Sequence, residues 1–333
     1  MVEAAAERVV VHQDEHRLNR AGEESGAPLV QLDDVRGSRV LRASPAVPLH
    51  ANIPAFSMSA PVPPIVQGHH VGTANGQTVH YVEAGSGDPV VFIHGSGPGA
   101  SGHSNFKGNY RWFADQGFRS VVPDLPGYGL SSKPEDIAYE LDFFVETLAG
   151  FLDALGLRRC TLVGNSLGGA IAIKYALNRP EAVRELILMG PGGLEEREVY
   201  FQMEGIQTMM KDFAAGTLDD AGMRRLLSIL VFDPKHVTDE LVAERVRVCA
   251  TQPKSVLATM RVPNLSDRLG EIRCPVLGFW GVNDKFCPSS GAAKILDRCA
   301  NARFLLINRC GHWVMVEHRD VFNRMCLDFL RSG

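Results

Sequence analysis

The sequence lacks most features that would place a protein outside a reducing, aqueous compartment. Its seven cysteines are an odd number and form no C-x-x-C pair, so neither a disulfide framework nor a zinc cluster is expected. Apolar runs such as PVVFIHG fall far short of the roughly 20 residues that cross a bilayer. The first twenty residues are charged throughout, without a continuous apolar stretch. We therefore expect no secretory signal, no membrane association and a cytoplasmic location.

The sequence also has little net charge. It contains 34 Lys and Arg against 38 Asp and Glu, a formal net charge of −4, which gives no electrostatic reason to expect nucleic acid as a partner. Hydrophobic residues, by contrast, make up 45% of the 333 residues, enough to bury a sizeable core. The length fits one large α/β domain with an insertion, or two smaller domains.

The N-terminal segment, residues 1–65, differs from the rest. Its first forty residues mix charged residues with Gly and Ser, and residues 45–64 carry six prolines. Proline removes backbone donors and blocks helix interiors, so we expect an extended or disordered extension, with a short helix possible near 3–18. An uninformative tail is the favoured interpretation, and a regulatory or docking arm is the alternative.

From about residue 66, strand-like and helix-like segments alternate. Apolar runs such as PVVFIHG, CTLVGN and PVLGFWG are continuous rather than alternating, which predicts a mostly parallel sheet covered on both faces. The segment 195–262 interrupts this pattern with amphipathic helical pieces and no convincing strand. We interpret 66–194 and 263–333 as the core and 195–262 as a helical cap over the ligand-binding edge, the alternative being an ordinary helical layer.

The motif G-x-S-x-G surrounds Ser166 in TLVGNSLGGAIAIKYAL. An apolar strand precedes the serine and a helical pattern follows it. Glycines on both sides permit the sharp turn that exposes a serine hydroxyl. Alone the motif is weak, and Ser166 could be only a small residue in a tight turn. Between a strand and a helix, the motif indicates a nucleophile.

A serine nucleophile needs a base and a group that orients the base. His312 follows the strand-like ARFLLIN, and Asp284 follows PVLGFWG. Each residue alone could be a solvated or turn-forming residue. The chain order Ser166, Asp284, His312 is the order of nucleophile, acid and base in one hydrolase fold class, so we predict a catalytic triad. Asp233, within the cap segment, ranks far below Asp284 as the acid.

Two backbone amides are candidates for stabilising an oxyanion. One belongs to Leu167, at the helix start, and the other lies in the glycine-rich loop HGSGPGA, residues 94–100. That loop also imitates a dinucleotide fingerprint, because G-x-G-x-x-A follows a strand and Asp124 ends the next one. We disfavour this alternative because SGHSNFKGNY makes a poor helix start. Asp124 is better interpreted as a turn residue that shapes the rim of the site.

Six stretches together resemble one family: HGSGPGASGHSNF, DLPGYGLS, VGNSLGGA, LMGPGG, CGHWVMVEH and FNRMCLDFL. In order and spacing they are similar to the meta-cleavage product hydrolases, which have the α/β-hydrolase fold and cut a carbon–carbon bond in ring-opened products of aromatic or steroid degradation. The resemblance covers about residues 66–333. It implies an eight-stranded, mostly parallel sheet flanked by helices, with an inserted helical cap.

The resemblance also implies roles for individual residues. Ser166, Asp284 and His312 match the triad, and the amide of Ser96 matches the second oxyanion donor beside that of Leu167. Five further residues match substrate contacts: Gly95, Asn105, Asn165, Arg245 and Trp313. Arg245 would pair with the substrate carboxylate, and Arg247 is the alternative. Solvated-helix and packing roles remain open for Arg245 and Trp313.

The reaction implied is hydrolysis of a 2-hydroxy-6-oxohexa-2,4-dienoate with a variable group on C6, giving 2-hydroxypenta-2,4-dienoate and a carboxylic acid. No metal or cofactor is expected, and a homodimer or larger homo-oligomer is. The alternatives are a serine carboxylesterase or lactonase on the same fold, and a non-catalytic ligand-binding homologue. Apolar cap residues could line the C6 pocket or form the core of the cap: Phe201, Met203, Met209, Met210, Leu226, Leu227 and Val231.

Overall fold

The structure, a computed structural model, describes residues 66–216 and 218–332. The N-terminal extension and the helix expected near residues 3–18 lie outside the described residues. None of the helices within the described part is long and apolar enough to cross a membrane.

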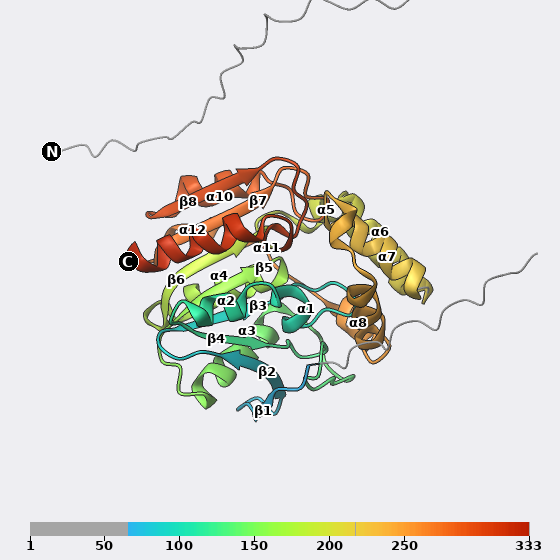
Figure 1. Cartoon of the computed structure of the whole chain (residues 1–333), viewed down its shortest axis with the longest axis horizontal. Coiled ribbons are helices and arrows are strands. Elements are labelled where there is room, and N and C mark those ends of the chain that lie inside the picture. Colours follow the sequence, from blue (N-terminus) through green and yellow to red (C-terminus); the bar gives the residue numbers. More distant parts are fainter. Residues whose placement is uncertain (1–65, 217, 333) are drawn as a thin grey trace, which may run out of the picture. The chain divides into compact units, whose positions relative to one another are not determined.

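One eight-stranded sheet forms the centre of the fold (Figure 1). Its strands are β1 (His69–Gly72), β2 (Thr78–Ala84), β3 (Pro89–Ile93), β4 (Arg119–Pro123), β5 (Cys160–Asn165), β6 (Val183–Met189), β7 (Val276–Gly281) and β8 (Ala302–Ile307). Their spatial order is β1-β2-β4-β3-β5-β6-β7-β8. The pairs that involve β1 and β2 are antiparallel, and all others are parallel. This confirms the predicted mostly parallel sheet.

Helices cover both faces of the sheet, which explains the continuous apolar strands. In β3, Val91 and Ile93 pack into one core, whereas Val90 and Phe92 pack into the other. The first core includes residues of α3 (Leu141–Ala154), α4 (Leu167–Asn178), α10 (Gly291–Arg298) and two 3-10 helices, η1 (Pro180–Ala182) and η3 (Ser266–Glu271). The second includes residues of α1 (Gly102–Phe106), α2 (Tyr110–Asp115), α11 (Val314–Glu317) and α12 (Arg319–Ser332).

The helical segment between β6 and β7 lies beside one end of the sheet (Figure 1). It contains α5 (Arg197–Phe201), α6 (Glu204–Ala215), α7 (Asp220–Leu230), η2 (Pro234–His236), α8 (Asp239–Cys249) and α9 (Ser255–Thr259). Side chains of Asp219 and Thr238 cap the N-termini of α7 and α8. No strand occurs in the described residues of 195–262, the segment interpreted above as a cap.

Two sequence-based interpretations near β3 and β4 are wrong. The SGHSNFKGNY stretch does start a helix, because Ser101 and Ser104 form a reciprocal capping box at the N-terminus of α1. Asp124 does not shape a rim. Its side chain is buried and accepts hydrogen bonds from the backbone amides of Gly102 and Leu130, so it organises two loops from within the core.

Candidate active site

Ser166 occupies a strained turn between β5 and α4. Its φ of 57° and ψ of −118° lie where a residue other than glycine is rarely found. A Cβ on Gly164 would come within 2.5 Å of the Gly168 carbonyl oxygen, and one on Gly168 within 2.1 Å of the Ile93 carbonyl oxygen. Both glycines of the G-x-S-x-G motif are therefore required by the close approach of backbone, and the turn presents Ser166 to a cavity.

Asp284 and His312 follow the neighbouring strands β7 and β8. Their side chains are 1% and 3% exposed, and His312 Nδ1 lies 2.7 Å from Asp284 Oδ2. The other carboxylate oxygen accepts from the amides of Phe286 and Cys287, at 2.7 and 3.0 Å. A carboxylate only accepts, so Nδ1 of His312 carries the proton and Nε2 is left as a base. His312 and Ser166 line the same cavity.

The Ser166 side chain lies near the thiol of Cys287. Burial raises the pKa of Cys287 well above its usual value, and the nearby Ser166 hydroxyl opposes that rise. Between the described side chains of Ser166 and His312 there is no hydrogen bond. Hydrogen bonds at active sites are often long or poorly aligned before substrate binds, and rotation about the serine Cα–Cβ bond turns the hydroxyl from one neighbour to another.

His94 fixes the peptide that carries the predicted oxyanion donor Ser96. His94 Nδ1 donates to the Gly95 carbonyl at 2.8 Å, and Nε2 accepts from the Leu125 amide at 2.9 Å. Carbonyl and amide point in opposite directions across a trans peptide, so the N–H of Ser96 is directed away from His94. The Tyr128 hydroxyl donates to the Ser96 carbonyl at 3.0 Å. Among the described residues, neither the Ser96 amide nor that of Leu167 has a hydrogen-bond partner.

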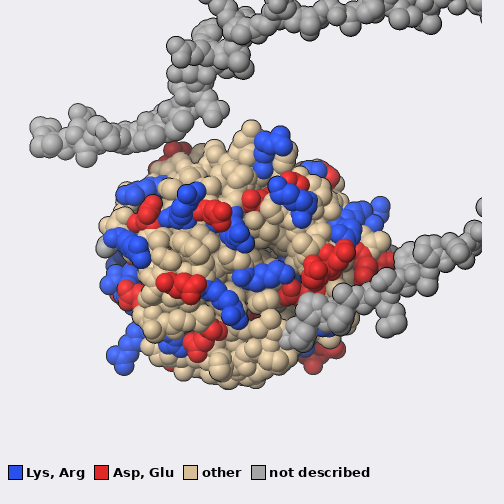
Figure 2. Space-filling model, in the orientation of Figure 1, with Lys and Arg blue, Asp and Glu red and all other residues tan. Residues whose placement is uncertain are grey.

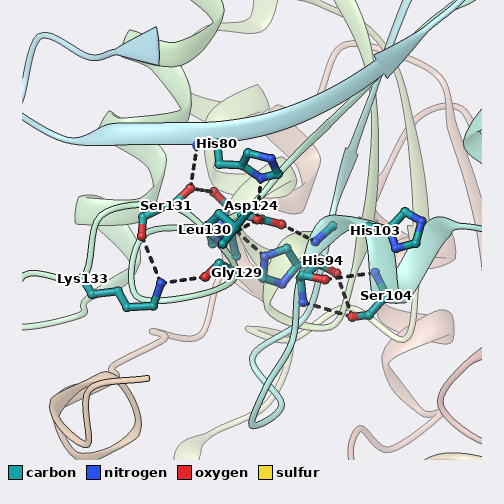
Figure 3. Close-up of polar contacts among 12 residues, drawn as sticks. His80, His94, His103, Ser104, Asp124, Gly129, Leu130, Ser131 and Lys133 are labelled. Atoms are coloured by element: carbon teal, nitrogen blue, oxygen red, sulfur yellow. Dashed lines mark hydrogen bonds and ion pairs between the residues drawn. The ribbon is translucent and has the colours of Figure 1, made fainter. Parts of the chain in front are cut away.

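The two bonds of His94 require a neutral ring with the proton on Nδ1. His94 is fully buried, and this burial lowers its pKa to about 4. Nearby, the carboxylate of Asp124 accepts a bond from His80 at 2.8 Å, and the Ser131 hydroxyl donates to the Asp124 carbonyl (Figure 3). A buried polar network therefore lies next to the 94–100 loop, on the side away from the cavity. His94 was not predicted from the sequence, although its position directly after an apolar strand is a signal that could have indicated it.

Arg245, on α8, is a buried cation beside Ser166. It is 1% exposed, and burial lowers its pKa to about 10. Nη2 donates to Oδ1 of Asn105 at 2.7 Å, and the guanidinium lies 4.9 Å from the ring of Trp313. Its Nε has no partner among the described residues. The adjacent carboxylate of Glu244 instead pairs with His103 and Lys107. The guanidinium therefore lies buried without a carboxylate to neutralise it.

Asn105 and Asn165 connect Arg245 to the serine turn. Asn105 Nδ2 donates to Asn165 Oδ1 at 3.4 Å, and Asn165 Nδ2 donates to the carbonyls of Met189 and His312 at 3.1 and 3.4 Å. All three side chains are almost fully buried. A polar chain thus runs from helix α8 to the turn that holds Ser166.

Two cavities meet at Ser166. The polar one has about 480 Å³ of empty space and is lined by Gly95, Ser96, Asn105, Asn165, Ser166, Arg245, His312 and Trp313, among others. The larger one has about 1660 Å³, partly open to solvent, and shares Ser96, Ser166, Ile206 and Met209 with the first. Leu167 and Cys287 line only this second cavity.

Nine of the ten predicted site residues line one or both of these cavities. The tenth, Asp284, lines neither and contacts His312. Arg247 lines neither cavity, nor does Asp233, which caps η2 and pairs with Lys235. Five of the seven apolar residues predicted for the C6 pocket or the core of the cap line one or both cavities: Phe201, Met209, Met210, Leu226 and Leu227. Met203 and Val231 line neither. Phe286, whose ring lies 5.3 Å from that of His312, was not predicted from the sequence.

The sheet and the serine turn define an α/β-hydrolase fold, and a family model with that description matches residues 88–224. The chain is 37% identical, over 77% of its length and 92% of the relative, to a 2-hydroxy-6-oxononadienedioate/2-hydroxy-6-oxononatrienedioate hydrolase of Comamonas testosteroni. It is equally similar to a 2-hydroxy-6-oxo-6-phenylhexa-2,4-dienoate hydrolase of Burkholderia cepacia.

Among solved structures, a meta-cleavage product hydrolase from Pseudomonas fluorescens IP01 is similar to this chain, with a TM-score of 0.72 and 29% identity. The match covers 80% of this chain and 98% of that one. The chain therefore belongs to the meta-cleavage product hydrolases, enzymes that hydrolyse a carbon–carbon bond.

Proposed function

We propose that this enzyme hydrolyses the C5–C6 bond of 2-hydroxy-6-oxohexa-2,4-dienoates, with Ser166 as nucleophile. The observation that carries the proposal is Arg245, a buried guanidinium without a carboxylate partner beside the predicted nucleophile. An arginine fork binds a carboxylate through two parallel hydrogen bonds. The C1 carboxylate of a dienoate supplies that partner, and the rest of the substrate then reaches from Arg245 towards Ser166.

The reaction begins with ketonisation of the bound dienol. The proton of the 2-hydroxyl leaves and C5 gains one, which gives a 2,6-dioxo acid with a C3–C4 double bond. The proposal assigns contact with the oxygen on C2 to Asn105 and Asn165, which form a hydrogen-bonded chain with Arg245. The ketone is an electron sink, because it can accept the electron pair of the bond that breaks next.

Ser166 then attacks C6 while Nε2 of His312 takes its proton, with Asp284 stabilising the charged imidazole. The amides of Ser96 and Leu167 hold the oxyanion. As the C5–C6 bond breaks, its electron pair moves into the enolate, which leaves as 2-hydroxypenta-2,4-dienoate with the proton from His312. Water, deprotonated by His312, attacks the acyl-serine and releases a carboxylic acid.

The test is conversion of a purified dienoate. Loss of the yellow dienolate absorbance, with stoichiometric formation of 2-hydroxypenta-2,4-dienoate and the acid, supports the proposal. Vigorous hydrolysis of simple esters, with no attack on any dienoate, contradicts it and favours the carboxylesterase alternative. If a fluorophosphonate fails to label Ser166 in the folded protein, the non-catalytic alternative is favoured.

Three expectations stay predictions: a cytoplasmic location, a homodimer or larger homo-oligomer, and the absence of nucleic acid, membrane, metal and cofactor from the working enzyme. On the face shown in Figure 2, acidic and basic side chains are interspersed rather than gathered into a patch of one sign. The described residues contain no group of three or more His, Cys, Asp and Glu able to hold a metal ion.

A further inference from the structure

The second cavity indicates what C6 of the substrate carries. We propose that the C6 substituent is a bulky apolar group of two or more rings, rather than a small alkyl group or a short chain that ends in a carboxylate. The inference rests on the proposed function, because it assumes that the dienoate end of the substrate lies against Arg245 and C6 lies at Ser166.

The position and size of the larger cavity favour a bulky C6 group. This cavity begins at Ser166 and Leu167 and is the larger of the two, about 1660 against 480 Å³ when the open solvent at each mouth is included. A substrate held at Arg245 with C6 at Ser166 directs its C6 group into this space. A methyl group would leave most of it filled with water, whereas a ring system would displace that water from apolar walls.

The side chains that line the larger cavity favour an apolar C6 group. Apolar side chains line the cavity without being buried by the rest of the fold: Phe201, Ile206, Leu257, Met260 and Val262 are half-buried, and Met210 is 43% exposed. Large apolar side chains gathered around a concave surface mark a binding site for an apolar group. Three methionines line this cavity, Met209, Met210 and Met260. The flexible Met side chain adapts to ligands of irregular shape.

The charges around the larger cavity disfavour a C6 group that ends in a carboxylate. Arg197 lies over the ring of Phe201, at 4.6 Å, and Arg261 donates to the carbonyls of Ala258 and Met260. Both arginines are exposed, unlike Arg245, and three acidic residues line the same cavity: Glu140, Asp142 and Glu196. Asp142 is paired with Lys174 at 3.1 Å, so the charges around the cavity roughly balance and do not favour a second carboxylate. Among the described residues, no buried cation lines these walls to neutralise one.

A substrate series tests the inference. It consists of 2-hydroxy-6-oxohexa-2,4-dienoates with methyl, 2-carboxyethyl, phenyl and a partly saturated bicyclic group on C6, compared by kcat/KM. We expect the bicyclic substrate to rank first and the carboxyethyl substrate at least about tenfold lower. A methyl, carboxyethyl or phenyl substrate in first place overturns the inference. Failure of all four substrates contradicts the proposed function itself, so the two failures are distinguishable.

A pair of alanine-to-tryptophan variants locates the subsite. Ala258 lines the larger cavity, whereas Ala214 is exposed on α6 and lines neither cavity. Ala258→Trp should lower the ratio of bicyclic to methyl kcat/KM at least about tenfold, because the indole occupies space that the rings need. Ala214→Trp should leave the ratio unchanged. An unchanged ratio in Ala258→Trp contradicts placement of the C6 group in this cavity.

Discussion

Nη2 of Arg245 donates a hydrogen bond of 2.7 Å to Oδ1 of Asn105, which joins helix α8 to helix α1. The two residues are 140 positions apart in the chain, and both are almost completely buried. Nη1 of Arg245 makes a longer bond of 3.4 Å to the Pro98 carbonyl, and its Nε has no partner among the described residues. The carboxylate site that we propose therefore exists only where the helical segment 195–262 meets the sheet-bearing core.

Arg245 should be the residue that binds the substrate carboxylate. Arg245→Gln removes the charge, and kcat/KM for a dienoate should fall by about two to three orders of magnitude, the usual cost of losing one partner of a buried charge pair. Arg247→Gln is the matched control, two residues along the same helix and on neither cavity. It should stay within about threefold of the parent enzyme. The reverse result would assign the carboxylate to Arg247.

Asp284 should act by orienting His312. Asp284→Asn keeps the shape of the side chain but can donate to Nδ1, which favours the wrong imidazole tautomer. We expect kcat to fall by about 10⁴ while KM changes little. Circular dichroism should show that the variant is folded. A variant with nearly full kcat would mean that another acid, such as Asp233, serves the histidine.

His94 should position the oxyanion donor. His94→Asn removes the acceptor for the Leu125 amide and loosens the Gly95–Ser96 peptide. Since one oxyanion donor contributes about 10²–10³ in kcat, a misplaced donor should lower kcat by at least about tenfold and leave KM within about threefold. His80→Asn is the control, because His80 bonds to Asp124 in the same network but not to the loop. An equal fall in kcat for both variants would indicate general damage to the fold.

His94 should also make stability depend on pH. Its pKa is lowered from 6.5 to about 4, so the unfolded chain binds a proton first as the pH falls. The contribution of neutral His94 to the free energy of unfolding is fully present above about pH 6.5. It is lost as the pH falls towards 4, and the total loss is about 3 kcal/mol. Urea unfolding at pH 7 and pH 5 should show a loss of about 2 kcal/mol from this residue. His94→Asn should lack that part of the decline, and an identical decline would refute the assignment.

The proximity of the three residues proposed as a triad could be predicted from sequence because of how parallel sheets are built. Ser166, Asp284 and His312 each follow an apolar strand, and the carboxyl ends of neighbouring parallel strands meet at one edge. Chain order then restricted their roles. Arg245 carried no comparable local signal, since an arginine in a helical pattern is usually solvated, and only the family resemblance indicated it.

The supporting network and the second cavity could not be predicted in this way. His94 reaches Leu125, and Asp124 reaches His80 and Gly102, all contacts between segments that no local pattern brings together. The side chains of Phe201, Leu257 and Met260 likewise come together around this cavity only in the folded chain. Asp124 was misinterpreted for this reason: its residue type suits a turn, but burial among backbone amides decides its role.

The most direct test of the account is cleavage of a 6-phenyl dienoate in H₂¹⁸O, with the parent enzyme and Ser166→Ala side by side. The account predicts rapid bleaching by the parent enzyme, 2-hydroxypenta-2,4-dienoate as one product, and one ¹⁸O atom in the benzoate. Ser166→Ala should be slower by at least about 10⁴. Undiminished cleavage by Ser166→Ala would contradict a serine nucleophile, and an intact dienoate with the parent enzyme would contradict carbon–carbon bond hydrolysis.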